Sequence, residues 1–317
     1  MVDEFAAESQ QIARRAFGKT AAARQPAVQT DKIPQILSDR LLERLLNLAI
    51  EPATVLDIGS PLESRQQQLL QSFPAARRLR AVWHEQQLGE TALALAGASR
   101  FAAAVTTFLP AKLQAFLPAQ PTLREFASDP CCLPLQDASV DLVLACQVLP
   151  WCAEPGALFR EIYRVLRPGG AFFWSSAGPD TLLEYRAIWA GIDQYPHVFG
   201  LHDMHDLGDD MLRSGFDSPV LDRENLTINY TSIADLMADL RAAGAVGLAA
   251  GRRRGLMAST MSNRLHELAD GSLDITIEHV QGHGWKTNQP GNTHVGRNNG
   301  EVRVPVSAIG RGASRQA

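Results

Sequence analysis

Residues 164–180, RVLRPGGAFFWSSAGPD, constrain the fold more than any other segment of this 317-residue chain. An apolar pattern with helical spacing leads into them and predicts an amphipathic helix, with Glu161 and Arg164 on its solvated face. The turn 168–170 ends that helix, because proline has no backbone N–H to donate and glycine adopts positive φ angles easily. The apolar run 171–174 follows at once and predicts a buried strand. A helix, a turn and a strand in this order are typical of an α/β sheet.

Further apolar runs upstream predict the rest of a parallel sheet. Residues 54–58 and 79–83 are separated by a crossover helix predicted over 66–73, and 123–126 predicts a third strand. Residues 140–146 form a near-continuous apolar run, which a strand covered on both faces requires. Strands that alternate with helices at this spacing indicate a doubly wound, parallel sheet.

Polar residues follow three of these strands: Asp57 and Gly59, then Glu85, then Ser128 and Asp129. Ligands of open α/β sheets bind outside the carboxyl ends of the strands, so these residues are candidates for a binding site. The polar loop 175–180 after the fifth strand is a candidate wall of the same site. The alternative for Asp57 and Gly59 is an ordinary strand-to-helix turn, and for Glu85 a solvated surface carboxylate.

The second half of the chain predicts a group of helices and an antiparallel strand. Helical spacing is clear over 182–189 and 233–240, whereas 219–221 and 226–230 are expected to be extended. Residues 273–280 alternate with period two, which is typical of a half-buried, antiparallel strand near a sheet edge.

Asp203 marks the start of another helix, since its side chain can cap the first turn, and Gly215 ends that helix. With Asp206 it forms an imperfect capping box. An apolar stripe is expected to face inward from Met204, Leu207, Met211 and Leu212. His202 and His205 could share a helical face as metal ligands, but no third ligand has a suitable spacing. We therefore expect no metal site.

Composition and charge exclude several classes of partner. A formal charge of −4, from 30 basic and 34 acidic residues, provides no basic field for nucleic acid or an anionic membrane. No apolar stretch approaches the roughly 18 residues that a membrane span requires, and the N-terminus carries no export signal. We expect a cytoplasmic protein whose cysteines are reduced and buried. They are Cys131, Cys132, Cys146 and Cys152.

Domain organisation follows from where the core pattern stops. Residues 1–35 are rich in Ala, Gln and Arg with weak periodicity and predict a flexible arm, although a firm amphipathic helix begins near Leu41. Residues 288–317 are rich in Asn, Gly and Arg and predict a disordered tail. The folded domain is expected to span 36–287.

These features together resemble a known family. The turn at Asp57 and Gly59, an acidic residue after the second strand, Ser128 with Asp129, and RVLRPGG before the fifth strand resemble a class I S-adenosylmethionine-dependent methyltransferase. Further segments are similar to the malonyl-acyl-carrier-protein O-methyltransferase (BioC) family of biotin synthesis. They are GPDTLLEYRAIW (178–189), His197, DMHDLGDDMLRSGF (203–216), PVLD (219–222) and GHGW (282–285).

The resemblance implies a mostly parallel, seven-stranded, Rossmann-like sheet with a helical cap. It implies S-adenosylmethionine as cofactor, held by Asp57, Gly59, Glu85, Ser128 and Asp129, with Asp129 meeting the adenine. It also implies that the cap receives a malonyl thioester on an acyl-carrier protein and that the methyl group moves to a free carboxylate. Four residues would lie on the substrate side: His197, Asp203, His205 and Asp206.

The first turn departs from the family pattern. Members carry glycines two, four and six positions after the strand-end aspartate, whereas this chain has Gly59, Pro61 and Glu63. Proline removes an N–H, and glutamate adds bulk and negative charge where the methionine carboxylate would lie, so each change is expected to weaken cofactor binding. His84 also occupies the position of the family's ribose-binding aspartate, and Glu85 comes one residue later.

Two functions stay open on these residues. The first is methyl transfer to a carrier-bound malonyl group. The second is a methyltransferase-fold protein without methyl transfer, which acts as an assembly or binding factor or hydroxylates an arginine like the related complex I assembly factors. The basic run 252–254 is either a solvated loop or a contact for an acidic carrier protein. Trp151, Trp174 and Trp189 are expected in the core, with the alternative that one lines an acyl pocket.

Overall fold

The computed structural model describes residues 32–48, 50–59, 63–82, 123–152, 154–198, 200–242, 259–287, 296–298 and 301–303. The chain divides into two compact units, Met1–Lys286 and Thr287–Ala317. In the second unit, β8 (Gly296–Asn298) pairs with β9 (Glu301–Arg303) in antiparallel fashion. The rest of the predicted tail, and residues 1–31 of the predicted arm, lie outside the described residues.

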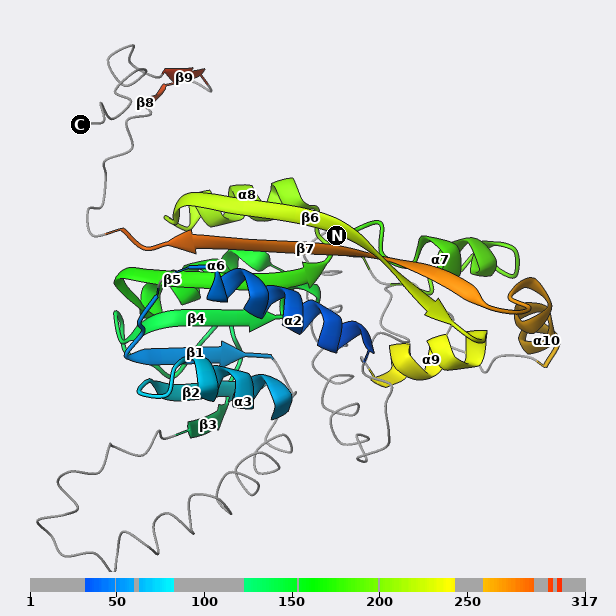
Figure 1. Cartoon of the computed structure of the whole chain (residues 1–317). Helices are drawn as coiled ribbons and strands as arrows, with labels where there is room; N and C mark the ends of the chain where they lie inside the picture. The colour runs from blue at the N-terminus through cyan, green and yellow to red at the C-terminus, as the bar shows by residue number, and fades with distance from the viewer. Residues whose placement is uncertain are drawn as a thin grey trace, which may run out of the picture. The chain divides into compact units, whose positions relative to one another are not determined.

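The first unit is built on a seven-stranded sheet with the order β3-β2-β1-β4-β5-β7-β6 (Figure 1). The first five strands of that order are parallel, whereas β7 is antiparallel to both β5 and β6. This confirms the predicted doubly wound, mostly parallel sheet. The strands are β1 (Thr54–Ile58), β2 (Arg77–Val82), β3 (Leu123–Ala127), β4 (Val140–Cys146), β5 (Leu166–Ala177), β6 (Asp217–Tyr230) and β7 (Leu273–Trp285).

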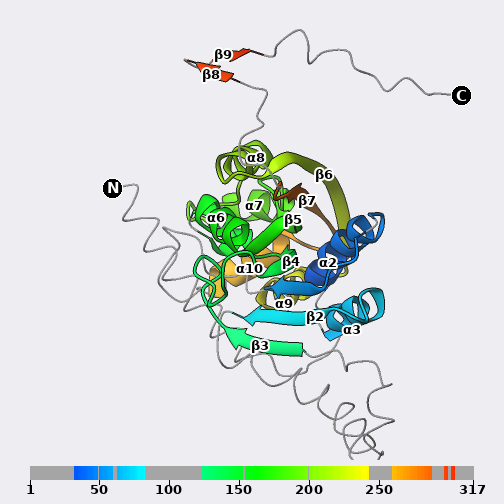
Figure 2. The same ribbon diagram turned by 90° about the vertical axis from the view of Figure 1, so that its left-hand side faces the viewer.

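Helices cover both faces of the sheet, which explains why β1 and β4 are buried along nearly their whole length. Figure 2 shows α2 (Lys32–Leu46) and α3 (Glu63–Ser72) on one side and α6 (Pro155–Val165) on the other. The α8 helix (Met204–Arg213) packs beside α6 and against β6. Each side has its own core of buried apolar residues, one with Phe159 and Trp174 and the other with Leu41 and Phe173.

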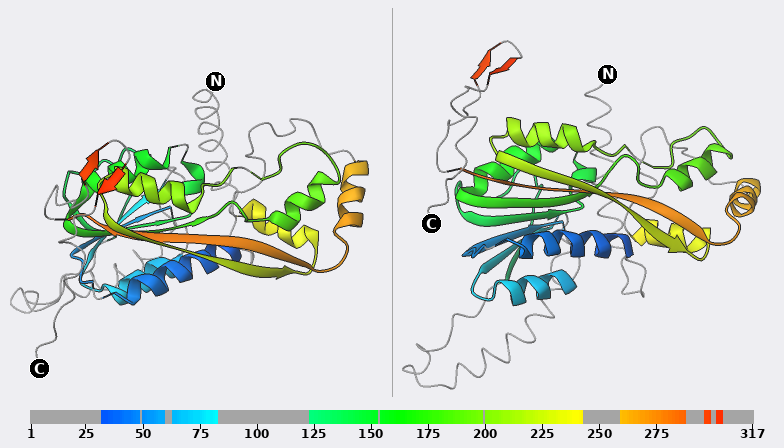
Figure 3. Two further views of the ribbon diagram at one scale, coloured as in Figure 1. Left: turned by 90° about the horizontal axis from the view of Figure 1, so that it is seen from above. Right: turned by 45° about the horizontal axis from the view of Figure 1, so that its top comes forward.

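A third apolar core lies beyond the carboxyl edge of the parallel strands. There β6 and β7 continue past the other strands as a two-stranded ribbon (Figure 3). Around it pack α7 (Leu183–Ala190), α9 (Ile233–Ala242) and α10 (Ser259–Leu268), with Tyr185, Trp189 and Tyr230 buried between them. These helices form the expected helical cap.

The turn 168–170 differs from its prediction. The α6 helix ends at Val165, and β5 already begins at Leu166, which pairs with Val140. The register then shifts, so that residues 167–170 form a bulge opposite Asp141, and Arg167 donates to both Asp141 oxygens at 2.8 and 2.9 Å. The Pro-Gly-Gly segment is therefore a bulge inside the strand and does not terminate the helix.

Other local predictions are confirmed or corrected by packing. Asp203 caps α8, as expected, and Gly215 follows this helix with φ +100°. Leu212, however, is 47% exposed, and the buried residues of α8 are Leu207, Gly208 and Met211. The predicted extended segments 219–221 and 226–230 are parts of the single strand β6.

The predicted burial is confirmed for the tryptophans but only for some of the cysteines. Trp151, Trp174 and Trp189 are buried as expected. Cys146 and Cys152 are buried thiols, whereas Cys132 is exposed and Cys131 is only partly buried. The prediction of burial is wrong for Cys132 because it lies in the turn after β3, where its N–H donates to the Asp129 carbonyl. None of the described helices is long and apolar enough to cross a membrane.

Candidate active site

The turn after β1 brings Asp57 and Gly59 to the point where the strand order reverses. Asp57 is buried between Arg80 of β2 and Leu144 of β4. Gly59 has φ +81°, and a Cβ there would lie 2.4 Å from Val148 Cγ2 and 3.1 Å from the Cys146 carbonyl oxygen. No other residue fits this turn without displacing the segment after β4. The structure thus places both residues where an open α/β sheet binds its ligand.

The turn after β3 is organised by Ser128 and Asp129 themselves. The Ser128 N–H donates to the Val82 carbonyl at 2.8 Å, and its hydroxyl donates to the Cys132 carbonyl at 2.9 Å. Asp129 Oδ1 accepts the Cys131 N–H at 3.0 Å. Both residues therefore lie at the carboxyl edge of the sheet, where their role as cofactor ligands stays a prediction. Glu85 lies outside the described residues, as do Pro61, His84 and the run 252–254.

An ion pair on α6 holds the loop that follows Asp129, which the sequence analysis missed. Glu161 Oε1 accepts the Leu133 N–H at 2.6 Å and an Arg164 N–H at 2.7 Å. Arg164 also donates to the Leu133 and Leu135 carbonyls at 3.1 and 2.8 Å. Hydrogen bonds that Arg164 donates to Glu161 and then to Asp137 raise the pKa of Arg164 further above its ordinary value. The face of α6 that was predicted to be solvated therefore holds the loop between β3 and β4 in place through these hydrogen bonds.

Glu161→Gln is expected to lower the unfolding free energy by about 1–3 kcal/mol at pH 7, because a charge-assisted hydrogen-bond network is lost. Burial alone would raise the pKa of Glu161, but the hydrogen bonds from Arg164 and Leu133 lower it overall. A carboxyl group with a lowered folded pKa stabilises the protein above its unfolded pKa, and that contribution disappears as pH falls through the folded pKa. The wild type should therefore lose more stability than Glu161→Gln between neutral and acidic pH, as measured by urea unfolding.

The matched control for this experiment is Glu267→Gln. Glu267 is also paired with an arginine, Arg264 at 3.1 Å, but its side chain is 64% exposed. Exposed ion pairs contribute little to the unfolding free energy. The unfolding free energy of the Glu267→Gln variant and its change with pH should therefore match those of the wild type within about 0.5 kcal/mol. Equal effects of the two substitutions would contradict the role of Glu161.

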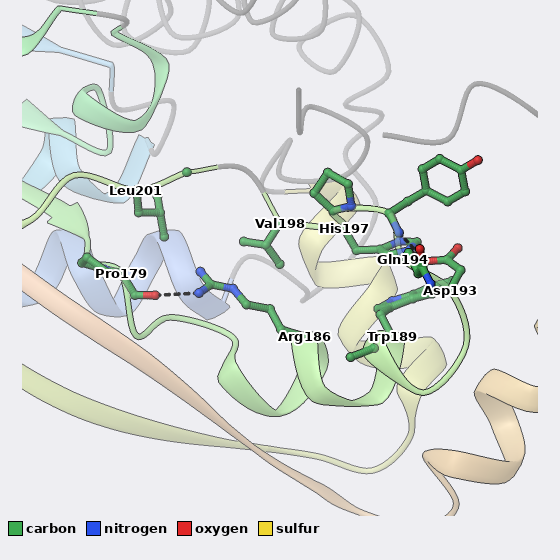
Figure 4. Close-up of a pocket in the computed structure, with 12 residues that line it drawn as sticks. Pro179, Arg186, Trp189, Asp193, Gln194, His197, Val198 and Leu201 are labelled. Atoms are coloured by element: carbon green, nitrogen blue, oxygen red, sulfur yellow. Dashed lines mark hydrogen bonds and ion pairs between the residues drawn. The ribbon is translucent and has the colours of Figure 1, made fainter. Parts of the chain in front are cut away.

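A pocket of about 530 Å³ opens between α7 and the segment that follows it (Figure 4). One wall is the Trp189 indole, on which the His197 ring stacks with 3.6 Å between centroids and 11° between planes. Asp193 Oδ1 contacts His197 Nε2 at 2.8 Å and accepts the Tyr195 N–H at 3.0 Å. Asp193 therefore closes this turn and fixes His197 against Trp189. His197 thus lies in a wall of this pocket, where its substrate-side role stays a prediction.

Arg186 also lines the pocket and was not singled out from the sequence. Its Nη1 donates to the Pro179 carbonyl at 2.8 Å, and Pro179 comes two residues after the end of β5 (Figure 4). The guanidinium therefore reaches back toward the carboxyl edge of the sheet. The sequence did contain a signal, since Arg186 precedes Trp189 by three residues on α7 and shares its face.

The remaining substrate-side candidates are not among the described residues that line this pocket. Asp203 and His205 are 51% and 85% exposed at the start of α8, and Asp206 is exposed beside them. Hydrogen bonds from the His205 N–H and then from its ring lower the pKa of Asp203. These contacts complete the helix cap. Within the described residues, no three His, Cys, Asp or Glu side chains are placed to hold a metal ion.

Comparisons with known proteins identify the family. Residues 90–174 match a methyltransferase domain. The chain is 35% identical over 298 residues to a malonyl-[acyl-carrier protein] O-methyltransferase of Laribacter hongkongensis, and the match covers 90% of this chain and 92% of that protein. The chain belongs to the malonyl-[acyl-carrier protein] O-methyltransferase family. A second member, from Gallionella capsiferriformans, is 34% identical over 252 residues, which are 78% of this chain and 81% of that protein.

Solved structures confirm the fold of this family member. The YcgJ protein of Bacillus subtilis is 12% identical with a TM-score of 0.51, and the match covers 79% of this chain and all of that one. A putative methyltransferase of Bacillus halodurans has the same identity and TM-score over 79% and 99% of the two chains. At this identity the likeness concerns the fold alone, which is the class I methyltransferase fold expected from the sequence.

The described part of the cofactor turn fits a methyltransferase of this family. Gly59 has φ +81°, and the segment after β4 packs directly against its Cα, so this turn can only be made by glycine. The buried Asp57 and the turn at Ser128 and Asp129 lie along the same edge of the sheet. These four residues therefore suit a ligand that spans the carboxyl ends of β1, β2 and β3.

Proposed function

We propose that this chain is an S-adenosylmethionine-dependent O-methyltransferase that acts on the free carboxylate of a malonyl group carried by an acyl-carrier protein, a step of biotin synthesis. The observation that carries the proposal is its 35% identity, over nine-tenths of its length, to a protein with that activity in its name. The Gly59 turn at the switch point of the sheet supports a cofactor site, and the α7 pocket supports an acceptor site.

The proposed reaction requires little acid–base catalysis from the protein. The bound cofactor supplies a methyl group on a positively charged sulfur, which is a good leaving group. A carboxylate is already nucleophilic, so neither a catalytic triad nor a metal is required. The residues of this chain contribute by aligning the reacting groups and by excluding water from them. We assign cofactor binding to Asp57, Gly59, Ser128 and Asp129, with Glu85 from beyond the described residues.

The test begins with calorimetric titration of the purified protein with S-adenosylmethionine and with S-adenosylhomocysteine. Binding at micromolar concentrations is expected. Transfer of a labelled methyl group to malonyl-loaded carrier protein should follow, with acetyl-loaded carrier protein as the control that lacks a free carboxylate. The absence of binding at millimolar cofactor would overturn the proposal and favour a methyltransferase-fold protein without methyl transfer.

Restoring the family glycines is expected to strengthen cofactor binding. The double change Pro61→Gly and Glu63→Gly should tighten S-adenosylmethionine about five- to tenfold, because it returns a backbone donor and removes a carboxylate that repels the cofactor's own. Calorimetry on the double variant measures the change. The control is Asp270→Gly, in an exposed loop beside α10, which should leave the affinity as it is. Unchanged affinity in the double variant would refute this explanation of the turn.

A further inference from the structure

We infer that Arg186 binds the free carboxylate of the acyl acceptor in the α7 pocket and thereby selects acyl groups that end in a carboxylate. This inference rests on the proposed function and deepens it. It assigns a ligand group to a pocket and names the side chain that recognises it.

The position of Arg186 is the first step of the argument. Its guanidinium is held by the Pro179 carbonyl at 2.8 Å, directly beyond the end of β5 (Figure 4). A guanidinium carries five N–H donors, and this bond uses one of them. Within the part of the chain that the structure describes, its other donors are left for a ligand near the carboxyl edge of the sheet, which is the edge on which the Gly59 turn lies.

The charge of the pocket is the second step. Among the described residues that line it, Asp193 is the only acidic one, and its Oδ1 is engaged by His197 and by the Tyr195 N–H. Within the described residues Arg186 makes no ion pair, whereas several other partly or fully buried arginines do. Examples are Arg80 with Glu125, Arg164 with Glu161, and Arg223 with Glu278. A cation without a carboxylate partner in a partly apolar pocket favours an anionic ligand.

The size and walls of the pocket are the third step. Pro179, Trp189, Val198 and Leu201 provide apolar surface, and the Trp189–His197 stack makes one wall flat. A volume of about 530 Å³ is in the range of small-molecule sites and exceeds a malonyl group. The excess leaves room for part of the arm that carries the thioester.

The proposed contact is compatible with the chemistry. Arg186 can hold one carboxylate oxygen while the other forms the new bond to the methyl carbon. The carbon–sulfur bond breaks and its electron pair stays on sulfur. A carboxylate and a sulfonium thus become a neutral ester and a neutral thioether, and no proton is transferred.

The test compares two ligands that differ only in the carboxylate, the malonyl and acetyl thioesters of N-acetylcysteamine. The wild type is expected to bind the malonyl thioester at least tenfold more tightly by calorimetry. Arg186→Gln, which keeps a donor for the Pro179 carbonyl but no charge, should abolish this preference, and Arg186→Lys should retain part of it. The matched control is Arg160→Gln on the exposed face of α6, which should keep the full preference.

Two readouts separate this inference from its alternatives. Affinity for S-adenosylhomocysteine and the thermal unfolding midpoint should be the same in Arg186→Gln as in the wild type, which shows that the fold and cofactor site are intact. A malonyl preference that persists in Arg186→Gln, or that is missing from the wild type, overturns the inference. If the preference depends on Arg186 but no methyl transfer occurs, the proposed function fails and the carboxylate site stands.

Discussion

Gly59→Ala is expected to lower the unfolding free energy by about 2–4 kcal/mol, as measured by urea unfolding. Two effects add at this position. The added Cβ would lie 2.4 Å from Val148 Cγ2, and a residue other than glycine is strained at φ +81°. Because the turn must shift to relieve the contact, affinity for S-adenosylhomocysteine should also fall by about tenfold or more.

Gly271→Ala separates these two effects. Gly271 has φ +87°, but a Cβ at this position would have no atom of the described residues within 4 Å beyond its chain neighbours, so only the backbone strain applies. We expect a loss of about 1–2 kcal/mol and unchanged cofactor affinity. Val148→Ala should rescue part of the Gly59→Ala effect by removing the contacted methyl group. If Gly59→Ala is no worse than Gly271→Ala, contact with Val148 does not explain the glycine.

Glu278→Ala is the second substitution with a large expected effect. The Glu278 side chain is 4% exposed; its Oε2 accepts the Asp180 N–H at 2.6 Å, and its Oε1 is 3.2 Å from Arg223 Nη1. Its removal leaves the partly buried Asp180 N–H without its partner. We expect a loss of about 2–4 kcal/mol in urea unfolding, less than for a fully buried ion pair because Arg223 is half exposed.

The same substitution should also weaken acceptor binding. Glu278 holds the loop that carries Pro179, the residue on which Arg186 rests. Binding of the malonyl thioester should therefore fall severalfold, while S-adenosylhomocysteine binding is retained. Glu43→Ala is the control, since Glu43 also pairs with an arginine but is 64% exposed. Its stability should change by less than about 1 kcal/mol. If both variants lost the same unfolding free energy, Glu278 would not be what holds the loop at Pro179 and Asp180.

The succession of strands along the chain was predictable because the strands of the parallel sheet carry their own local signals. Buried parallel strands such as β4 are apolar on both faces, and glycine marks the turns that need positive φ angles, as Gly59 does. Register is set by pairing with distant residues, so the bulge at 167–170 opposite Asp141 could not be read from the sequence. Leu212 shows the same limit, since its apolar character predicted burial, whereas the structure leaves it 47% exposed and buries Gly208.

The candidate site was predictable where function follows from position in the fold. Asp57 lies near the end of β1, and Gly59, Ser128 and Asp129 directly follow strands, so all four lie at the carboxyl edge. Charged side chains on helices were harder to interpret, because a solvated face is the usual explanation for them. Arg164 meets residues about thirty positions earlier in the chain, and Arg186 meets Pro179 through a turn of the loop. Such partners become visible only once the chain is folded.

The long strands β6 and β7 limit how the cap can move. The part of β7 from residue 279 onward pairs with β5 in the central sheet, whereas residues 273–278 pair only with β6 and carry the cap (Figure 3). The cap is thus an extension of the same hydrogen-bonded ladder and not a hinged lid. The position of the cap relative to the central sheet is therefore set by the pairing of β6 and β7. If the proposed cofactor edge and the α7 pocket act together, the distance between them is defined by the strand register of the sheet.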